Sequence, residues 1–95
     1  MSSMPNVAQP SSAPWRARVL VFAELKRRLN APVAEVELPQ GATVGDLRRA
    51  LEVSHPSLAP LLPACRIAVN AEYMDDTHPL DPSSELALIP PVSGG

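Results

Sequence analysis

The residues with the clearest chemical potential stand at the end of the sequence, where Gly94 and Gly95 follow Ser93 and an apolar run that begins at Ile89. Two final glycines leave the terminal carboxylate without a neighbouring Cβ. Such an end can pass through a narrow channel and present a bare acyl group to another protein's active site. The alternative interpretation is an ordinary frayed terminus, because chain ends are often poorly ordered.

The segment before the glycines predicts an extended exit from the domain. Pro90 and Pro91 cannot continue a strand ladder, and they favour a stiff, extended backbone. Six residues at about 3.3 Å each reach roughly 20 Å, which is far enough to enter a neighbouring active site. We therefore expect a flexible C-terminal tail made of Pro90, Pro91, Val92, Ser93, Gly94 and Gly95.

The remaining sequence contains no pattern that predicts a catalytic or metal site. It has no glycine-rich phosphate loop, no Ser-His-Asp arrangement and no paired histidines with metal spacing. His55 and His78 each precede a proline, and Asp75-Asp76 lacks further ligands for a cation. Cys65 lies in an apolar run, which predicts a buried thiol. We expect no bound cofactor, no metal and no catalytic site of the chain's own.

The composition predicts one small domain. Only three residues are aromatic, so Val, Leu, Ile and Ala must build the core. A single cysteine excludes an internal disulfide, and no stretch approaches the roughly 18 apolar residues of a membrane span. Residues 1–14 lack the features of a secretory signal and are predicted to be a disordered leader. We therefore expect a soluble, cytoplasmic protein.

The charges are distributed unevenly along the chain. All eight basic residues lie within residues 1–66, whereas residues 67–95 contain five acids and no Lys or Arg. This asymmetry favours steering of the C-terminal part toward a basic partner surface, although a merely solvated acidic face has the same composition. The basic runs at 26–28 and 48–49 are too short and too mixed with acids to indicate nucleic-acid binding.

Apolar periodicity predicts the elements that must position the tail. We expect strands over 16–22, 33–38, 65–69, 72–74 and 85–89, and a short helix over 23–29. The main helix should begin after Thr43, which forms a weak capping-box variant with Asp46, and end before Pro56. The order β-β-α-β-β-β predicts an α+β roll over residues 15–89, with one main helix on a mixed sheet of about five strands.

Strand parity predicts a second apolar face. The core should take Val19, Val21, Ile67, Val69, Leu86 and Leu88. With one main helix covering one side, the other side is left with Leu20, Phe22, Ala68, Ala87 and Ile89. A contiguous apolar patch usually marks a partner site, while scattered surface hydrophobes are also common. Because the tail leaves from the edge of this patch, we expect the patch and the tail to bind the same partner.

Several segments are similar to the small-subunit family of molybdopterin synthase. They are VLVFA at 19–23, LPQGATVGDL at 38–47, AVN at 68–70, HPL at 78–80 and, most specifically, PPVSGG at 90–95. The resemblance covers residues 16–95 and implies the ubiquitin-like β-grasp fold. It also implies that Phe22, Tyr73 and Ile89 contact a partner.

The resemblance implies a sulfur carrier. An E1-like adenylating enzyme would use ATP to adenylate Gly95, and sulfur would then replace AMP to give a C-terminal thiocarboxylate. The tail would enter the large subunit of molybdopterin synthase and give sulfur to cyclic pyranopterin monophosphate, in molybdenum cofactor biosynthesis. Two alternatives remain open. One is a thiazole-pathway sulfur carrier, which usually lacks the double proline, and the other is a ubiquitin-like modifier joined to lysines through Gly95.

Overall fold

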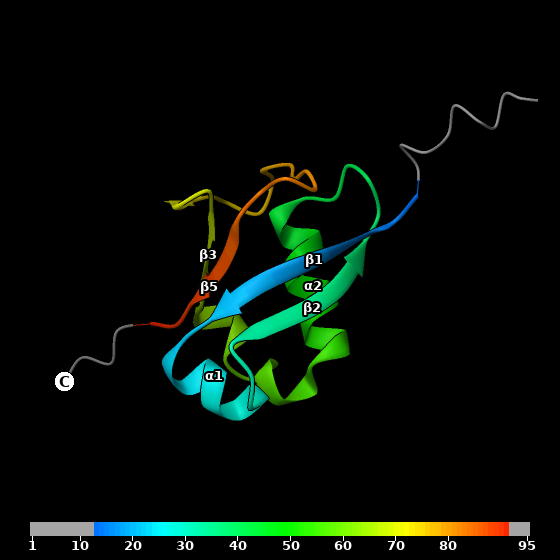
Figure 1. The fold of residues 1–95 in the computed structure, drawn as a ribbon. Helices are drawn as coiled ribbons and strands as arrows, with labels where there is room; N and C mark the ends of the chain where they lie inside the picture. Colours follow the sequence, from blue (N-terminus) through cyan, green and yellow to red (C-terminus); the bar gives the residue numbers. More distant parts are fainter. Residues whose placement is uncertain (1–12, 92–95) are drawn as a thin grey trace, which may run out of the picture.

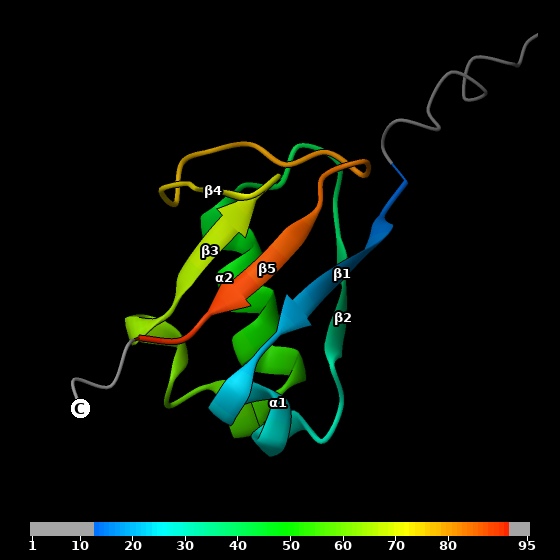
Figure 2. The ribbon, with the colours of Figure 1, turned by 60° about the vertical axis from the view of Figure 1, so that its left-hand side comes forward.

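The computed structural model describes residues 13–91 and shows a mixed five-stranded sheet with helix α2 across one face (Figures 1 and 2). The strands are β1 (Trp15–Val21), β2 (Val33–Leu38), β3 (Arg66–Val69), β4 (Glu72–Tyr73) and β5 (Leu86–Ile89). The helices are α1 (Ala23–Leu29) and α2 (Val44–Ser54), with 3₁₀ turns η2 (Pro56–Leu58) and η3 (Leu62–Ala64). The expected β-β-α-β-β-β order is confirmed.

Two predicted segments fall mainly outside this range. The expected leader lies outside the described residues up to position 12, and so do the tail residues Val92, Ser93, Gly94 and Gly95. Strand β2 has the expected bounds, the bounds of the other four strands differ from the expected ones by one residue, and the 3₁₀ turn η2 follows α2 at Pro56. The 3₁₀ turn forms there because Pro56 suits the first position of a helical turn.

The sheet is mixed because the first and last strands lie side by side. The strand order is β2-β1-β5-β3-β4, with β1 parallel to β5 and every other pair antiparallel. The predicted pairing of the first two strands is confirmed. Val21 lies opposite Leu88, so the next residues, Phe22 and Ile89, come together at the end of the sheet from which the tail leaves.

The core lies between the sheet and α2, and strand parity predicts its members correctly. Val19, Ile67 and Leu88 are fully buried, and Val21 and Leu86 are nearly so. Helix α2 adds Val44, Leu47 and Leu51, which share one side of the helix. The side chains on the inner face of the sheet therefore form the core with α2, whereas those on the outer face do not pack against this helix.

Helix α2 begins at a complete capping box. The Thr43 hydroxyl accepts the Asp46 backbone N–H at 3.3 Å, and the Asp46 carboxylate accepts the Thr43 N–H at 3.0 Å. The helix ends at Ser54, as the position of Pro56 predicts. The sequence indicated this motif only weakly, because the third position usually holds Glu or Gln.

The capping carboxylate should make stability depend on acid. Hydrogen bonds from the backbone and hydroxyl of Thr43, and then from Arg49, hold the pKa of Asp46 below its ordinary 3.8. Because the folded-state pKa is the lower one, the stabilisation is present above 3.8 and is lost as the pH falls through the folded value. We expect the urea midpoint to fall between about pH 5 and pH 3, and Asp46→Asn to reduce this fall. An equally steep fall in the variant would contradict the assignment.

The hairpin between β3 and β4 turns through two residues with positive φ. Asn70 has φ 53° and Ala71 has φ 71°, a turn that favours Asn-Gly. Asn70 suits this turn, because Asn tolerates positive φ and its side chain accepts the Glu85 N–H at 2.9 Å. Ala71 does not suit it, because its Cβ makes the backbone strained at positive φ.

Ala71→Gly should therefore stabilise the protein. We expect a gain of about 0.5–1 kcal/mol, since relief of strain outweighs the added freedom of the unfolded chain. The melting temperature should rise by about 2–8 °C. Ala31→Gly is a matched control, because Ala31 does not have positive φ, and it should not raise the melting temperature. A thermal melt in which Ala71→Gly is no more stable than the native chain would contradict this account.

Candidate functional site

The outer face of the sheet contains an apolar groove of about 320 Å³ beside the point where β5 ends. Its lining residues come from four strands, from positions directly next to two of these strands, and from the hairpin turn: Leu20, Phe22, Ala68, Ala71, Tyr73, Glu85, Ala87 and Ile89. The structure thus brings together all six residues predicted for a partner interface. Ala71 and Glu85 were not predicted, although strand parity on β5 places Glu85 on the same face.

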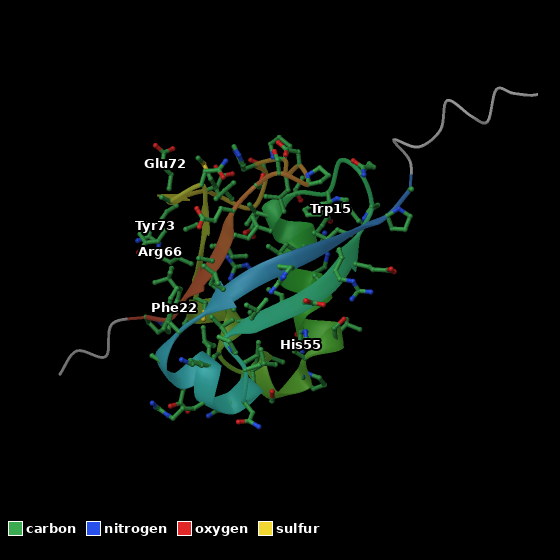
Figure 3. The ribbon with its side chains drawn as sticks, viewed as in Figure 1. Trp15, Phe22, His55, Arg66, Glu72 and Tyr73 are labelled. Atoms are coloured by element: carbon green, nitrogen blue, oxygen red, sulfur yellow. The ribbon has the colours of Figure 1, made fainter. Side chains whose placement is uncertain are left out.

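Exposed apolar side chains concentrate at this groove. Within residues 13–91, the large hydrophobic residues that remain exposed are Leu20, Phe22, Val53 and Tyr73, and only Val53 lies elsewhere, on α2. Phe22 is 44% exposed and Tyr73 is 53% exposed. Figure 3 shows both on the same side of the molecule, well away from His55 at the end of α2. An apolar surface concentrated in this way is typical of a partner site.

Ala68 is more buried than expected for a residue of the exposed apolar face. It lies on the outer face, but it is only 7% exposed. Its neighbours across the two pairings of β3 are Tyr73 and Ala87, and its methyl group is short compared with the Tyr73 ring. Ala68 therefore forms the floor of the groove, while Phe22 and Tyr73 form the accessible walls.

The base of the tail lies at one end of the groove. Ile89 is the last residue of β5, and Pro90 and Pro91 follow it directly. The two prolines border a second hollow of about 380 Å³ between the tail and α1, which is lined also by Ala23, Glu24, Arg27 and Leu61. Within the described residues, the chain thus leaves the sheet between α1 and the groove.

Ala23 joins β1 to α1 in a conformation that the sequence does not signal. Phe22 is extended, and Ala23 has φ 54°, in the left-handed region that residues with a Cβ rarely adopt. This turn directs the chain from the sheet into α1 directly after Phe22. Backbone strain of this kind persists only where the surroundings enforce it, and here it adjoins the groove and the tail.

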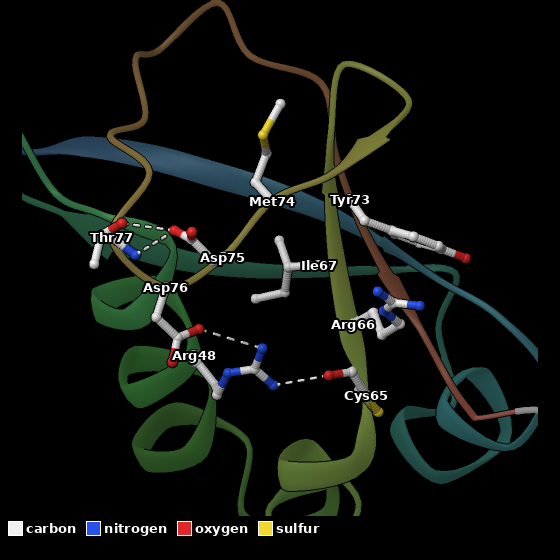
Figure 4. A pocket seen from close by; sticks show the side chains of 9 residues that line it. All are labelled: Arg48, Cys65, Arg66, Ile67, Tyr73, Met74, Asp75, Asp76 and Thr77. Atoms are coloured by element: carbon white, nitrogen blue, oxygen red, sulfur yellow. Dashed lines mark hydrogen bonds and ion pairs between the residues drawn. The ribbon is translucent and has the colours of Figure 1, made fainter.

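A larger hollow of about 770 Å³ lies on the other side of Tyr73 (Figure 4). Arg48 donates to the backbone oxygens of Leu62 at 2.7 Å and of Cys65 at 3.0 Å, and its guanidinium lies 3.5 Å from the Asp76 carboxylate. These contacts join α2 to the segment before β3 and to the loop after β4. Arg48 therefore has a structural role in this hollow.

Cys65 is a buried thiol, as its apolar context predicts. It is 4% exposed and donates to the backbone oxygen of Leu61 at 3.1 Å. Burial raises the pKa of the thiol, which keeps it protonated and a poor nucleophile. Within the part of the chain that the structure describes, no group of three or more His, Cys, Asp or Glu residues could hold a metal ion. No helix in residues 13–91 is long and apolar enough to cross a membrane.

The similarity to known proteins includes the residues of the tail. The ThiS family model matches residues 19–95. This range includes the end of β1, the other four strands and the two final glycines. The chain belongs to the ThiS family. A molybdopterin synthase sulfur carrier subunit from Chlamydomonas reinhardtii is 35% identical to it over 80 residues. The match covers 82% of this chain and 96% of that protein.

Solved structures show the same fold. SAMP1 from Haloferax volcanii is 29% identical and matches with a TM-score of 0.74, over 85% of this chain and 100% of that chain. A putative molybdopterin converting factor subunit 1 from Pyrococcus furiosus is 26% identical and has a TM-score of 0.71, over 81% of this chain and 98% of that chain. This ThiS-family chain therefore has the ubiquitin-like α+β fold that the sequence resemblance implied.

Proposed function

We propose that this chain is the sulfur carrier subunit of a molybdopterin synthase and acts in molybdenum cofactor biosynthesis in the cytoplasm. The likeness to a sulfur carrier subunit carries the proposal, because it extends over 96% of the relative's length. The groove supports it independently, since it offers an apolar docking surface where the tail begins.

The reacting group in this proposal is the carboxylate of Gly95. An E1-like adenylating enzyme joins a carboxylate oxygen to the α-phosphate of ATP and releases pyrophosphate. A sulfur donor at the oxidation level of sulfide then attacks the Gly95 carbonyl carbon through sulfur, AMP leaves with the bonding electrons, and a thiocarboxylate remains after loss of the proton. Adenylation is needed because a free carboxylate is a poor electrophile. ATP and the catalytic side chains are supplied by the activating enzyme.

The second half of the cycle takes place in the large subunit. That subunit covers the groove, contacts Phe22, Tyr73 and Ile89, and admits the tail into its active site. The thiocarboxylate sulfur is transferred there to cyclic pyranopterin monophosphate. A terminal Gly-Gly suits this passage, because a backbone without Cβ atoms passes through a narrow channel. The carrier contributes the sulfur and the docking surface, and the large subunit contributes the catalytic site.

Reconstitution with the large subunit from the same organism tests the proposal. The purified chain, the adenylating enzyme, ATP, a sulfur donor and the pterin substrate should yield molybdopterin only when the large subunit is present. The carrier and the large subunit should also elute together from a size-exclusion column. Failure of both complex formation and product formation, with a folded carrier, would overturn the proposal.

A ubiquitin-like modifier is a second candidate, which the likeness to the small archaeal modifier protein SAMP1 favours. In that case, the Gly95 carboxylate would form isopeptide bonds with lysines of other proteins. Because residues 67–95 contain no Lys or Arg, trypsin would leave this whole segment attached to the modified lysine. Denaturing purification followed by mass spectrometry should detect such branched peptides if the chain is a modifier, and none if it is only a sulfur carrier.

A further inference from the structure

We propose that Arg66, stacked on Tyr73 at the tail end of the groove, binds a carboxylate side chain of the large subunit and so helps to select that partner. This inference rests on the proposed function, because it assigns a chemical feature to the protein that covers the groove. It goes further by placing an acidic residue of the partner opposite one named side chain.

The position of Arg66 joins it to the docking surface. It lies opposite Ile89 in the pairing of β3 with β5, and Ile89 is the last strand residue before the tail. Its guanidinium carbon is 4.3 Å from the centre of the Tyr73 ring. Figure 4 shows the two side chains next to each other. Arg66 lines the larger hollow of about 770 Å³, and Tyr73 lines both that hollow and the groove, so the guanidinium lies beside the groove, on the far side of Tyr73.

Among the described residues, Arg66 differs from most other basic residues because it has no ion-pair partner there. Within residues 13–91, six basic residues lie within 4.0 Å of a carboxylate oxygen: Arg16, Arg18, Arg27, Arg28, Arg48 and Arg49. Of the remaining two, Lys26 lies on α1 beside a separate hollow. In the described part of the chain, Arg66 is thus the unpaired cation that adjoins the groove.

The two carboxylates that line the larger hollow together with Arg66 have other partners. Asp76 pairs with Arg48, and Asp75 accepts hydrogen bonds from the backbone and hydroxyl of Thr77. The donors of the Arg66 guanidinium are therefore available to a group from outside the described residues. A guanidinium unpaired in solution gains most from a partner when docking removes the surrounding water.

Stacking on Tyr73 prepares Arg66 for a planar anion. The ring occupies one face of the guanidinium and limits its rotamers, so less conformational freedom is lost on binding. The N–H donors stay in the plane of the group, where they match the two oxygens of a carboxylate. A phosphate dianion fits less well, because residues 67–95 contain five acids that repel it more strongly than a single carboxylate.

Binding of the large subunit to charge variants tests the proposal. Calorimetric titration should show that Arg66→Glu raises the Kd by more than about 30-fold and Arg66→Leu by about tenfold, because both remove the ion pair and Glu adds repulsion. Arg49→Glu is the matched control, since it makes the same change in charge at an exposed site on α2 and should leave the Kd within about twofold. High salt should weaken native binding more than binding of Arg66→Leu.

Compensation identifies the partner residue. Replacing the correct Asp or Glu of the large subunit with Arg should restore binding of Arg66→Glu at least tenfold and should weaken binding of the native chain. If Arg66→Glu and Arg66→Leu bind as tightly as the native chain, the Arg66 proposal is wrong and the proposed function stands. If the folded native chain itself fails to bind the large subunit, the proposed function fails, and this inference fails with it.

Discussion

Deletion of Gly95 lowers sulfur transfer to the pterin substrate by more than about a hundredfold, since a misplacement of about 1 Å can already cost that much and one residue spans about 3.3 Å. The shortened tail ends on Gly94, so the carboxylate is held too far from the reacting atoms of the large subunit. Replacement of Gly94 with a bulky residue should also abolish sulfur transfer, because the added side chain blocks the narrow passage. The measurement is the initial rate of molybdopterin formation in the reconstituted system.

The fold should survive this deletion. Within residues 13–91, the buried core runs from Ala17 to Leu88, and the deletion leaves all of these residues in place. The melting temperature of the shortened chain should match that of the native chain within about 1 °C, as for other changes away from the core. Ser93→Ala is the matched control, because it keeps a small residue in the tail and the full length, and it should retain sulfur transfer. Transfer retained by the shortened chain would refute the role of Gly95.

Phe22→Arg raises the Kd for the large subunit by about 30- to 700-fold, which corresponds to the 2–4 kcal/mol typical of an aromatic interface residue. The native ring fills a wall of the groove, whereas arginine brings a charge that must be dehydrated when the partner covers it. Ile89→Arg should have a similar effect at the tail end of the groove. Calorimetric titration measures both.

Stability distinguishes loss of binding from loss of folding. Phe22 is 44% exposed, so its replacement should change the free energy of unfolding by less than about 0.5 kcal/mol. Val53→Arg is the matched control, because Val53 is an exposed apolar residue, at 80%, but lies on α2 outside the groove. It should leave the Kd unchanged. If Phe22→Arg and Val53→Arg had the same Kd as the native chain, the groove would not be the docking surface.

The sheet and its two faces could be predicted because alternation follows directly from strand geometry. Val19 and Val21 are buried while Leu20 and Phe22 are exposed, and β5 repeats the pattern with Leu86 and Leu88. The same rule predicts most of the residues that line the groove, since it sorts side chains by face. The helix boundary at Pro56 follows from backbone restriction before proline.

Other features depend on tertiary packing, which a local pattern does not contain. The positive φ of Ala23 has no sequence signal, because glycine or asparagine usually occupies such a position. The stacking of Arg66 on Tyr73 requires the pairing of β3 with β4, and the burial of Ala68 depends on the size of its neighbours across the sheet. The chemistry of the tail follows from the resemblance, because composition alone is also compatible with a frayed end.

Intact mass of the C-terminal peptide tests the central claim most directly. After incubation with the adenylating enzyme, ATP and a sulfur donor, exchange of oxygen for sulfur on Gly95 should add about 16 Da to the tryptic peptide 67–95. Trypsin cleaves after Arg66, so this peptide excludes Cys65 and any sulfur bound to it. The same treatment of the chain without Gly95 serves as the control. A peptide 67–95 of unchanged mass, from a preparation in which the activating enzyme consumes ATP, would contradict the account.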